Sequence, residues 1–583
     1  MDRKYKFVDG LFAVMLLMTS FIVLSRQAVY RLEFKEQIGI FLFGADRISW
    51  YLSNPAVVSC IVGDWLTQFF ISGRNGAMIC FLLLTATFLG LARIFRRSNP
   101  DRTLFWMALI LPVMLEAYFI PFPNYPISAA VGLTASVWMA CLLAQIKDKR
   151  YSSVIYGLSV PVTYVLFGAH ALTLALLLWF IKRKEGVKPI LCLAAGVVVM
   201  LVAGRFYNLS FVHSLIWPVY PDYIIPSLWL LLCQPLFILA FMFLSFGLDR
   251  IKYTRWIIGT LCTICFCGSW MLRGVRYSDL EETVKIGSLA YKGKWTEVKR
   301  MATRETPYCA YYGNVCNARD GKLAEDLLKG QWGRADNVLF LSTTQGNPYF
   351  NMIYFTDALL EMGDVSQATD CALLAQTVMP GHYSTRMLRR LAEIAVVTAD
   401  YDVARKYLDI LMCTRNHREW AQELLDCIEN DDIPQQYLTW RSRTLSRDHF
   451  FRQGDIRSSL SIIASEQPFN RTAVDYLLCS YLLDKNLNTF ISLYDKYYLG
   501  ALDRIVKVPE VYQEALLVNV NSRESLIETV EKYRISEKTV NKFMSLMEAR
   551  SKSPDSSNVM TQDAMGTYWH YIMAVRFNNK EQK

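Results

Sequence analysis

The stretch RWIIGTLCTICFCGSWMLR, residues 255–273, is the last long apolar segment of the chain and divides it into two halves. As a helix it would be about 28 Å long, close to the thickness of the hydrocarbon core of a bilayer. Before it, apolar segments alternate with short basic loops, whereas residues 274–583 carry amphipathic helical patterns. The sequence therefore predicts an all-α protein with a membrane domain at residues 1–273 and a soluble helical domain after it.

The charge of the chain is unevenly distributed between these halves. Of the 583 residues, 53% are hydrophobic, which is high for a soluble protein. Residues 1–275 carry 24 Lys and Arg against 12 Asp and Glu, and the remainder carry 38 against 40. The basic excess belongs to the membrane half, where topology explains it, so we expect no nucleic-acid partner.

Nine apolar segments are candidates for membrane spans, because their lengths approach the roughly 20 residues that a helical crossing needs. They are residues 7–25, 75–92, 103–119, 128–146, 151–168, 171–181, 189–204, 227–248 and 255–273. The fifth and sixth share only 31 residues, so they form either two crossings or a tight helical hairpin that does not cross fully. Both alternatives return the chain to the same side, so the downstream topology is the same.

Basic residues gather in alternate loops of this nine-span arrangement. The side that contains the amino terminus holds 17 of the 24: Arg3, Lys4, Lys6, Arg93, Arg96, Arg97, Arg102, Lys147, Lys149, Arg150, Lys182, Arg183, Lys184, Lys188, Arg250, Lys252 and Arg255. The positive-inside rule places that side in the cytoplasm. We therefore predict a multi-pass bacterial inner-membrane protein whose second half faces the periplasm.

The first outer loop, residues 26–74, mixes charged and aromatic residues, which favours helices that lie in the membrane interface. Residues 55–72 include Asp64 and Gln68, so we predict an interfacial or re-entrant helix there rather than another span. Further polar residues are expected at the same outer face: Glu116, His170, Arg205, His213, Tyr220 and Asp222. They form either a shared polar pocket or separate side chains that snorkel to water.

Six positions in the second half each end one amphipathic pattern and precede another: Gly293, Gly321, Gly363, Ala399, Gly454 and Lys485. A small or flexible residue is suited to end a helix there. The steps between them are 28, 42, 36, 55 and 31 residues, and the longest has room for an extra helix around residues 417–429. The sequence predicts consecutive helix pairs over most of residues 274–550.

This pattern is clearest in EMGDVSQATDCALLAQ and TADYDVARKYLDIL, and it resembles the tetratricopeptide-repeat (TPR) superfamily. The resemblance covers roughly residues 278–499 and implies a TPR-like α-solenoid with a concave binding face. The full consensus is absent and the repeats are irregular. After a polar linker at residues 551–558, the aromatic segment 560–577 is expected to form a terminal helix that covers the last repeat.

The layout of the first half resembles polyprenyl-phosphate-dependent membrane glycosyltransferases of the GT-C class. Those enzymes have a long first outer loop with interfacial helices and a carboxylate, and often a soluble outer domain. The resemblance implies Asp46 or Asp64 as the carboxylate that activates an acceptor hydroxyl, with Glu116 as a further catalytic candidate. It implies Arg205 as a ligand of the lipid phosphate, with His170, His213 and Asp222 as further substrate-binding candidates. The adjacent acidic pair that is usual in the class is missing here.

No phosphate-binding loop, HExxH motif or GxSxG elbow occurs in the sequence, so we expect no metal and no other cofactor. The favoured hypothesis is a membrane protein that displays a periplasmic TPR-like solenoid to bind a protein partner in cell-envelope assembly. The alternative is a GT-C-like glycosyltransferase that uses a polyprenyl-phosphate sugar at the outer face. The polar residues named above would form its site.

Overall fold

The structure is a computed structural model that describes residues 17–98, 110–146, 152–182, 187–219, 279–302, 306–330, 332–340, 348–379, 383–445, 456–501, 507–552 and 561–575, with the single positions Val14, Pro235 and Ile238. Every regular element in these ranges is helical, which confirms the predicted all-α class. The expected spans at residues 227–248 and 255–273 lie outside the described ranges, as do Gly454 and Asp222.

The chain divides into two compact units, which are described separately below. Unit 1 contains Met1–Val284 together with two short segments of the second half, Met379–Leu388 and Asp409–Gln422. Unit 2 contains Lys285–Val378, Arg389–Leu408 and Glu423–Lys583. The sequence predicted a division after residue 273, but nothing in it indicated that two later segments pack with the membrane half.

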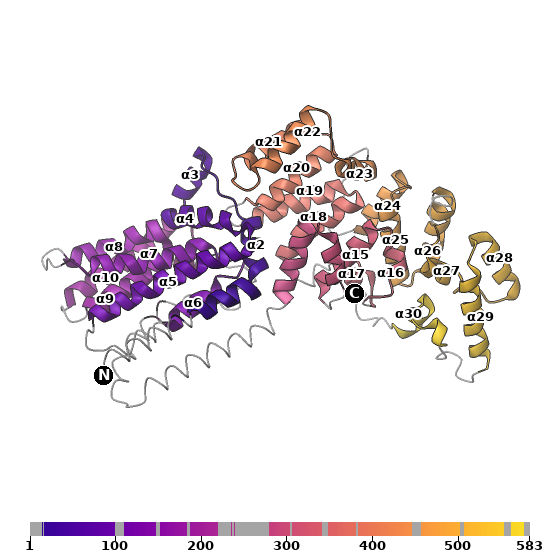
Figure 1. Cartoon of the computed structure of the whole chain (residues 1–583), viewed down its shortest axis with the longest axis horizontal. Helices are drawn as coiled ribbons and strands as arrows, with labels where there is room; N and C mark the ends of the chain where they lie inside the picture. Colours follow the sequence, from indigo (N-terminus) through magenta and orange to yellow (C-terminus); the bar gives the residue numbers. More distant parts are fainter. Residues whose placement is uncertain are drawn as a thin grey trace. The chain divides into compact units, whose positions relative to one another are not determined.

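Unit 1 is built from helices that Figure 1 shows in indigo to magenta. They are α2 (Val29–Ile38), α3 (Ala45–Leu52), α4 (Val57–Thr67), η1 (Gln68–Ile71), α5 (Gly73–Ser98), α6 (Ile110–Phe119), α7 (Ile127–Leu143), α8 (Ser152–Phe167), η3 (Gly168–His170), α9 (Ala171–Lys182), α10 (Val187–Phe206) and α11 (Phe211–Ile216). Helices α5, α7, α8 and α10 lie side by side (Figure 1) and share one apolar core.

Contacts between these helices give their relative directions. Trp138 of α7 donates to the Ala86 carbonyl of α5 at 3.1 Å, and the Cys141 thiol lies 3.4 Å from the Gly90 carbonyl, so α5 and α7 run in parallel. Both were predicted to cross from the outer to the inner side, and their parallel course agrees with that prediction.

Helices α8 and α9 form a hairpin. The Lys182 ammonium group at the end of α9 lies 5.3 Å from the ring of Tyr156 near the start of α8. The chain reverses at Gly168, whose φ of +77° is accessible to glycine at little cost. The described parts of the two arms have 16 and 12 residues. The hairpin returns the chain to the side from which it came, and whether its arms cross fully stays a prediction.

Three stretches in the described ranges are long and apolar enough to cross a membrane: Gly73–Phe95, Ser152–Lys182 and Val187–Phe206. The second of them is the α8–α9 hairpin. The apolar helices Val57–Ile71 and Ile127–Leu143 are shorter. The short helix at Val57–Ile71 agrees with an interfacial or re-entrant element, and the full set of nine spans stays a prediction.

Unit 2 is a succession of shorter helices, drawn from pink to yellow in Figure 1. They are α14 (Trp295–Met301), α15 (Pro307–Arg319), α16 (Leu323–Asp326), α17 (Ala335–Val338), α18 (Pro348–Met362), α19 (Val365–Val378), α20 (Thr385–Val397), α21 (Tyr401–Met412), α22 (Arg418–Glu429), α23 (Gln435–Arg443), α24 (Ile456–Glu466), α25 (Arg471–Leu483), α26 (Leu487–Tyr494), the π-helix η6 (Asp495–Ala501), α27 (Glu510–Leu516), α28 (Arg523–Tyr533), α29 (Glu537–Ser551), η7 (Gln562–Ala564) and α30 (Tyr568–Ala574). Parts of α20, α21 and α22 belong to unit 1.

One type of turn joins many of these helices, and it falls where the sequence predicted it. The predicted positions in the described ranges, Gly293, Gly321, Gly363, Ala399 and Lys485, have φ between +60° and +91°. At Gly321, for example, the N–H groups of Gly321 and Lys322 donate to the carbonyls of Ala318 and Asn317. The same two bonds recur at the other four positions and define Schellman motifs, which satisfy the last carbonyls of each helix. The extra helix expected around residues 417–429 is α22.

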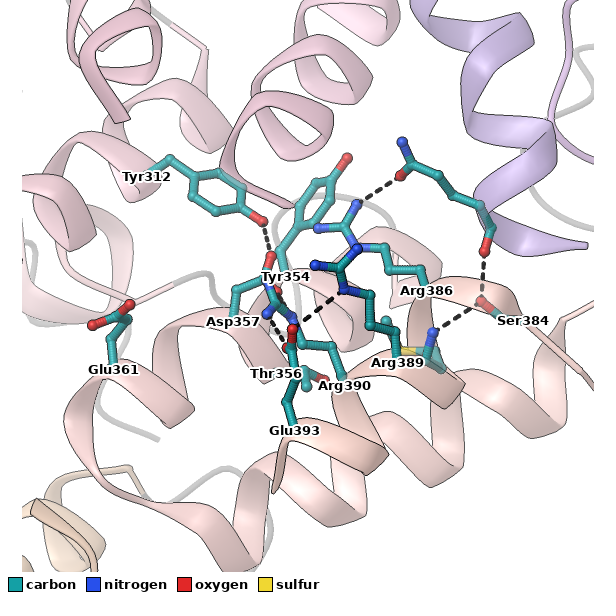
Figure 2. Close-up of polar contacts among 12 residues, drawn as sticks. Tyr312, Tyr354, Thr356, Asp357, Glu361, Ser384, Arg386, Arg389, Arg390 and Glu393 are labelled. Atoms are coloured by element: carbon teal, nitrogen blue, oxygen red, sulfur yellow. Dashed lines mark hydrogen bonds and ion pairs between the residues drawn. The ribbon is translucent and has the colours of Figure 1, made fainter. Parts of the chain in front are cut away.

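A buried polar seam fixes how the helices of unit 2 pack (Figure 2). Asp357 of α18 accepts a hydrogen bond from the Tyr312 hydroxyl of α15 at 2.7 Å and pairs with Arg390 of α20 at 2.8 Å. Arg390 also pairs with Glu393. These groups are almost inaccessible to solvent, so each charge depends on its partner. The seam specifies one register for three helices.

Candidate functional site

Helix α2, in the predicted first outer loop, is polar yet buried. Arg31, Glu33, Lys35, Glu36 and Gln37 are each at most 7% exposed. Buried charged and polar side chains require partners, because loss of hydration destabilises them. The partners of α2 come from four separate parts of unit 1: the loop after α6, Glu281, which pairs with Arg31 at 2.9 Å, and the segments Met379–Leu388 and Asp409–Gln422.

Lys35 connects α2 to the loop after α6. Its ammonium group donates to the carbonyls of Phe122 and Tyr125, each at 2.5 Å. Burial lowers the pKa of Lys35 to about 7. The Tyr125 hydroxyl in turn donates to the Glu116 carboxylate at 2.6 Å, and Glu116 is only 1% exposed. Glu116 thus lies in a closed network beneath α2 rather than at an open surface.

The carboxyl end of α2 is capped by residues 384–386. The Ser384 hydroxyl donates to the Gln37 carbonyl at 2.8 Å, and the Thr385 hydroxyl donates to the Glu36 carbonyl at 2.9 Å. Arg386, which is fully buried, donates to the Gln37 side-chain oxygen at 3.1 Å. The last carbonyls of a helix have no partner within it, so these hydroxyls supply what α2 lacks.

The second segment binds the side chain of Glu36. Its carboxylate lies 3.0 Å from Nε2 of His417 and accepts from the Asn416 amide at 3.2 Å. Asn416 also donates to the Gln68 carbonyl at 2.6 Å, and the Arg415 guanidinium lies 5.0 Å from the Phe69 ring. Helix α2 and η1 therefore hold residues 415–417 from two sides.

These contacts surround a polar hollow with an empty volume of about 350 Å³, open mouth included. It is lined by Glu36, Gly39, Ile40, Phe41, Asp64, Thr67, Gln68, Thr385, Thr414, Arg415, Asn416 and His417. We call this set the α2 hollow. Its two carboxylates already have hydrogen-bond partners, since Asp64 accepts from the Tyr51 hydroxyl at 2.7 Å and from Arg47 at 3.2 Å.

Unit 2 has a different feature at its carboxyl end, where helix α30 packs against the end of α25, helix α27 and the pair Trp332–Gly333. We call the surface formed by these elements the groove of α30. Within it, Tyr568, Trp569 and Tyr571 are at most 4% exposed. The terminal helix expected from the aromatic segment 560–577 is therefore present and is bound through its aromatic side chains.

Comparison with known proteins gives the relationship of the chain but no activity. Residues 3–574 match a family described as "Family of unknown function (DUF6057)". The chain belongs to this family. No curated protein and no solved structure is significantly similar to it. The match covers both halves of the chain.

The structure scatters the residues that the GT-C resemblance named. Of these, Asp64 lines the α2 hollow, whereas Asp46 is exposed at the start of α3. His170 is nearly buried beside Thr173 at 3.5 Å. Arg205 is exposed near the end of α10 and His213 is half-buried in α11, while Tyr220 and Asp222 lie outside the described ranges. Among the described residues, only Asp64 of this set reaches the hollow.

Sequence reasoning missed Glu36, Asn416 and His417 as site residues. Glu36 stands in a loop that was predicted to be interfacial, and a charge there is expected to face water. His417 lies 381 positions away, and no spacing rule connects two residues at that separation. The available signal was the density of charges in VYRLEFKEQI, which is too polar for a membrane helix and has too little apolar surface for an interfacial one.

Proposed function

We propose that the chain is an integral membrane protein whose second half is a helical-repeat domain that binds a protein partner outside the cytoplasm, in assembly of the cell envelope. The observation that carries this proposal is the occupied groove of unit 2. That unit already holds a short helix through specific side-chain contacts, which is how helix-in-groove recognition between proteins works. Consecutive helix pairs that end in the same Schellman turn support a TPR-like solenoid, an architecture used to bind proteins.

The α2 hollow supports the same proposal from the membrane side. A simple anchor needs one span, whereas unit 1 binds two segments of the tail through buried hydrogen bonds. Unit 1 therefore binds two segments of the second half as well as carrying the apolar helices.

Photo-crosslinking in cells tests the proposal. Benzoylphenylalanine in place of Trp332, at the groove wall, should form an adduct with a second protein, and the yield should rise in a chain that ends at Lys552 and lacks α30. The same substitution at Lys406, an exposed residue of α21, serves as the control. Adducts that are confined to the chain itself, in both backgrounds, would contradict a protein-binding role.

The glycosyltransferase alternative retains one favourable observation, the position of Asp64 in a polar hollow beside Glu36, Arg415 and His417. In that case Asp64 would activate the acceptor hydroxyl, and Glu36 or His417 would replace the expected Glu116 and His170. Asp64→Asn in cells should then abolish one envelope glycan, while Asp46→Asn should not. Unchanged glycans in the Asp64→Asn strain would exclude this alternative.

A further inference from the structure

Helix α30 is bound at both of its ends. The first N–H, that of Tyr568, donates to the Glu514 carboxylate of α27 at 2.8 Å. At the other end the Lys485 ammonium group donates to the carbonyls of Ile572 at 2.7 Å and Val575 at 2.5 Å. Backbone groups at helix ends have no partners within the helix, so the groove recognises the length of a two-turn helix as well as its sequence.

The side chains of α30 are bound through their polar tips. The Tyr568 hydroxyl donates to the Leu482 carbonyl at 2.8 Å. The Tyr571 hydroxyl lies 2.6 Å from the carbonyls of both Leu483 and Gly333, which share its one proton. The Trp569 indole donates to the Glu514 carbonyl at 2.9 Å. Each ring buries its apolar body and satisfies its one donor, which is the favourable way to bury Tyr and Trp.

All these acceptors are backbone carbonyls, and two of them belong to the last turn of α25. They are present whatever occupies the groove, and the Leu482 carbonyl also accepts from the Lys485 N–H at 3.0 Å. Trp332 completes the wall, with its ring 5.9 Å from Tyr571 and 4.8 Å from His570, both edge-to-face. The groove is therefore built to hold a helix with aromatic donors at relative positions 1, 2 and 4.

We propose that this groove is the partner site of the tail, and that its ligand is a short helix of a partner protein with the α30 pattern: Tyr, Trp and Tyr at positions 1, 2 and 4. The inference rests on the proposed function and names the partner class for it. Helix α30 is then a tethered occupant that a partner helix replaces. Residues 553–560, which join α29 to η7 in the sequence, read SPDSSNVM and are mostly polar.

A binding experiment with purified components tests this. The probe is a labelled peptide of residues 561–577, TQDAMGTYWHYIMAVRF, and the receptor is the chain ending at Lys552 in lipid nanodiscs. We expect the peptide to bind this receptor saturably. The affinity for the complete chain should be lower by about tenfold or more, because α30 competes there. Lys485→Glu in the receptor, or Tyr568→Phe with Tyr571→Phe in the peptide, should weaken binding by about tenfold or more. Lys406→Glu should not.

A second receptor keeps the test informative if the chain that ends at Lys552 does not fold. Trp569→Ala in the complete chain removes the largest buried ring of α30 and should open the groove to the peptide. Absence of binding to both receptors, with cooperative unfolding preserved, would show that α30 is a permanent cap and would overturn the inference. Peptide binding without any cellular crosslink would instead sink the proposed function, so the two failures are distinguishable.

Discussion

Helix α2 in unit 1 and helix α25 in unit 2 both have carbonyls in their last turn that accept hydrogen bonds from hydroxyl groups of a distant part of the chain. Ser384 and Thr385 cap α2, whereas Tyr568 and Tyr571 cap α25. Around the capped end of α2 the neighbours are charged or amide side chains, including Glu36, Arg386 and His417. Around the capped end of α25 they are aromatic rings.

The difference between these surroundings decides which contact is replaceable. A buried charged group that loses its partner is costly, so the α2 cap is tied to one set of residues. The α25 cap depends on burial of three rings and on backbone groups of α30 that Glu514 and Lys485 bind, and any short helix with similar rings can supply both. We therefore expect the α2 contacts to be permanent and the α30 contacts to be exchangeable. The four predictions below test this contrast, in descending order of expected effect.

The largest effect is expected from Trp569→Ala. Loss of a buried Trp side chain costs about 3–5 kcal/mol, which exceeds what the remaining contacts of a seven-residue helix can offset. Hydrogen exchange of the α30 amides should become fast while that of α18 and α19 is unchanged. Met565→Ala removes a 63% exposed side chain from the same segment and is the control. Unaltered protection of α30 would mean that its rings do not hold it in place.

Next is the pH dependence of α30 docking. Burial raises the pKa of Glu514 to about 7, despite the opposing hydrogen bond from the Tyr568 N–H. A carboxyl whose pKa is raised in the docked state binds its proton more tightly there. Docking of α30 is therefore strongest below pH 4.5, the usual pKa of the group. It weakens as the pH rises from 4.5 to about 7, and it is constant at higher pH. The full change is about 3 kcal/mol.

Glu514→Gln cannot titrate and should remove that pH dependence while keeping an oxygen for the Tyr568 N–H. Hydrogen exchange of α30, corrected for intrinsic rates and measured from roughly pH 4.5 to 8, provides the test. The exposed Glu531→Gln variant should behave like the parent chain. If the parent shows no loss of α30 protection over this range, Glu514 does not control docking.

A smaller effect is expected for Glu36→Ala in unit 1. The substitution removes the acceptor of two buried donors, from Asn416 and His417, at a cost of about 2 kcal/mol. Limited proteolysis should then cut residues 413–418 faster, and the folded core of unit 1 should remain. Glu419→Ala, at an exposed site of α22, provides the comparison. Equal cleavage rates in the two variants would show that Glu36 does not hold this segment.

The smallest effect is expected for Thr385→Val, which keeps the shape of the side chain and removes its hydroxyl. The Gln37 carbonyl keeps the Ser384 hydroxyl, so only the Glu36 carbonyl loses its main partner, at about 1 kcal/mol. Thr377→Val, whose hydroxyl bonds within its own exposed turn, is the matched control. The melting temperature of each variant in nanodiscs provides the measurement. An equal decrease for both variants would show that the Thr385 hydroxyl does not stabilise the end of α2.

Features that depend on local sequence were predictable. Gly321 and Lys485 end helices because the backbone there turns into a left-handed conformation, and the apolar periodicity on either side marks the helices. The aromatic segment around Trp569 indicated a terminal helix for the same reason. In contrast, the pairing of Glu36 with His417 depends on how α2 packs with a segment from the other end of the chain. The periodicity of a local segment cannot predict a contact between residues so far apart in the sequence.

The GT-C resemblance likewise names individual residues of the sequence but does not indicate which of them lie close together in the fold. Asp64, in the first outer loop, lines the α2 hollow, and Glu116 and His170 do not. Distance in the fold cannot be read from the order of loops, so the resemblance could not indicate which residues lie beside Asp64. Glu116 is instead closed off by Tyr125 beneath Lys35.

The proposed function requires the second half of the chain to lie on the outer side of the membrane, the side that is also predicted for α2. The direct test is labelling of Cys413, the exposed thiol that follows α21, with a membrane-impermeant maleimide in intact spheroplasts. The account predicts modification without lysis, and its loss in a Cys413→Ser variant. Labelling that appears only after the inner membrane is broken would contradict it.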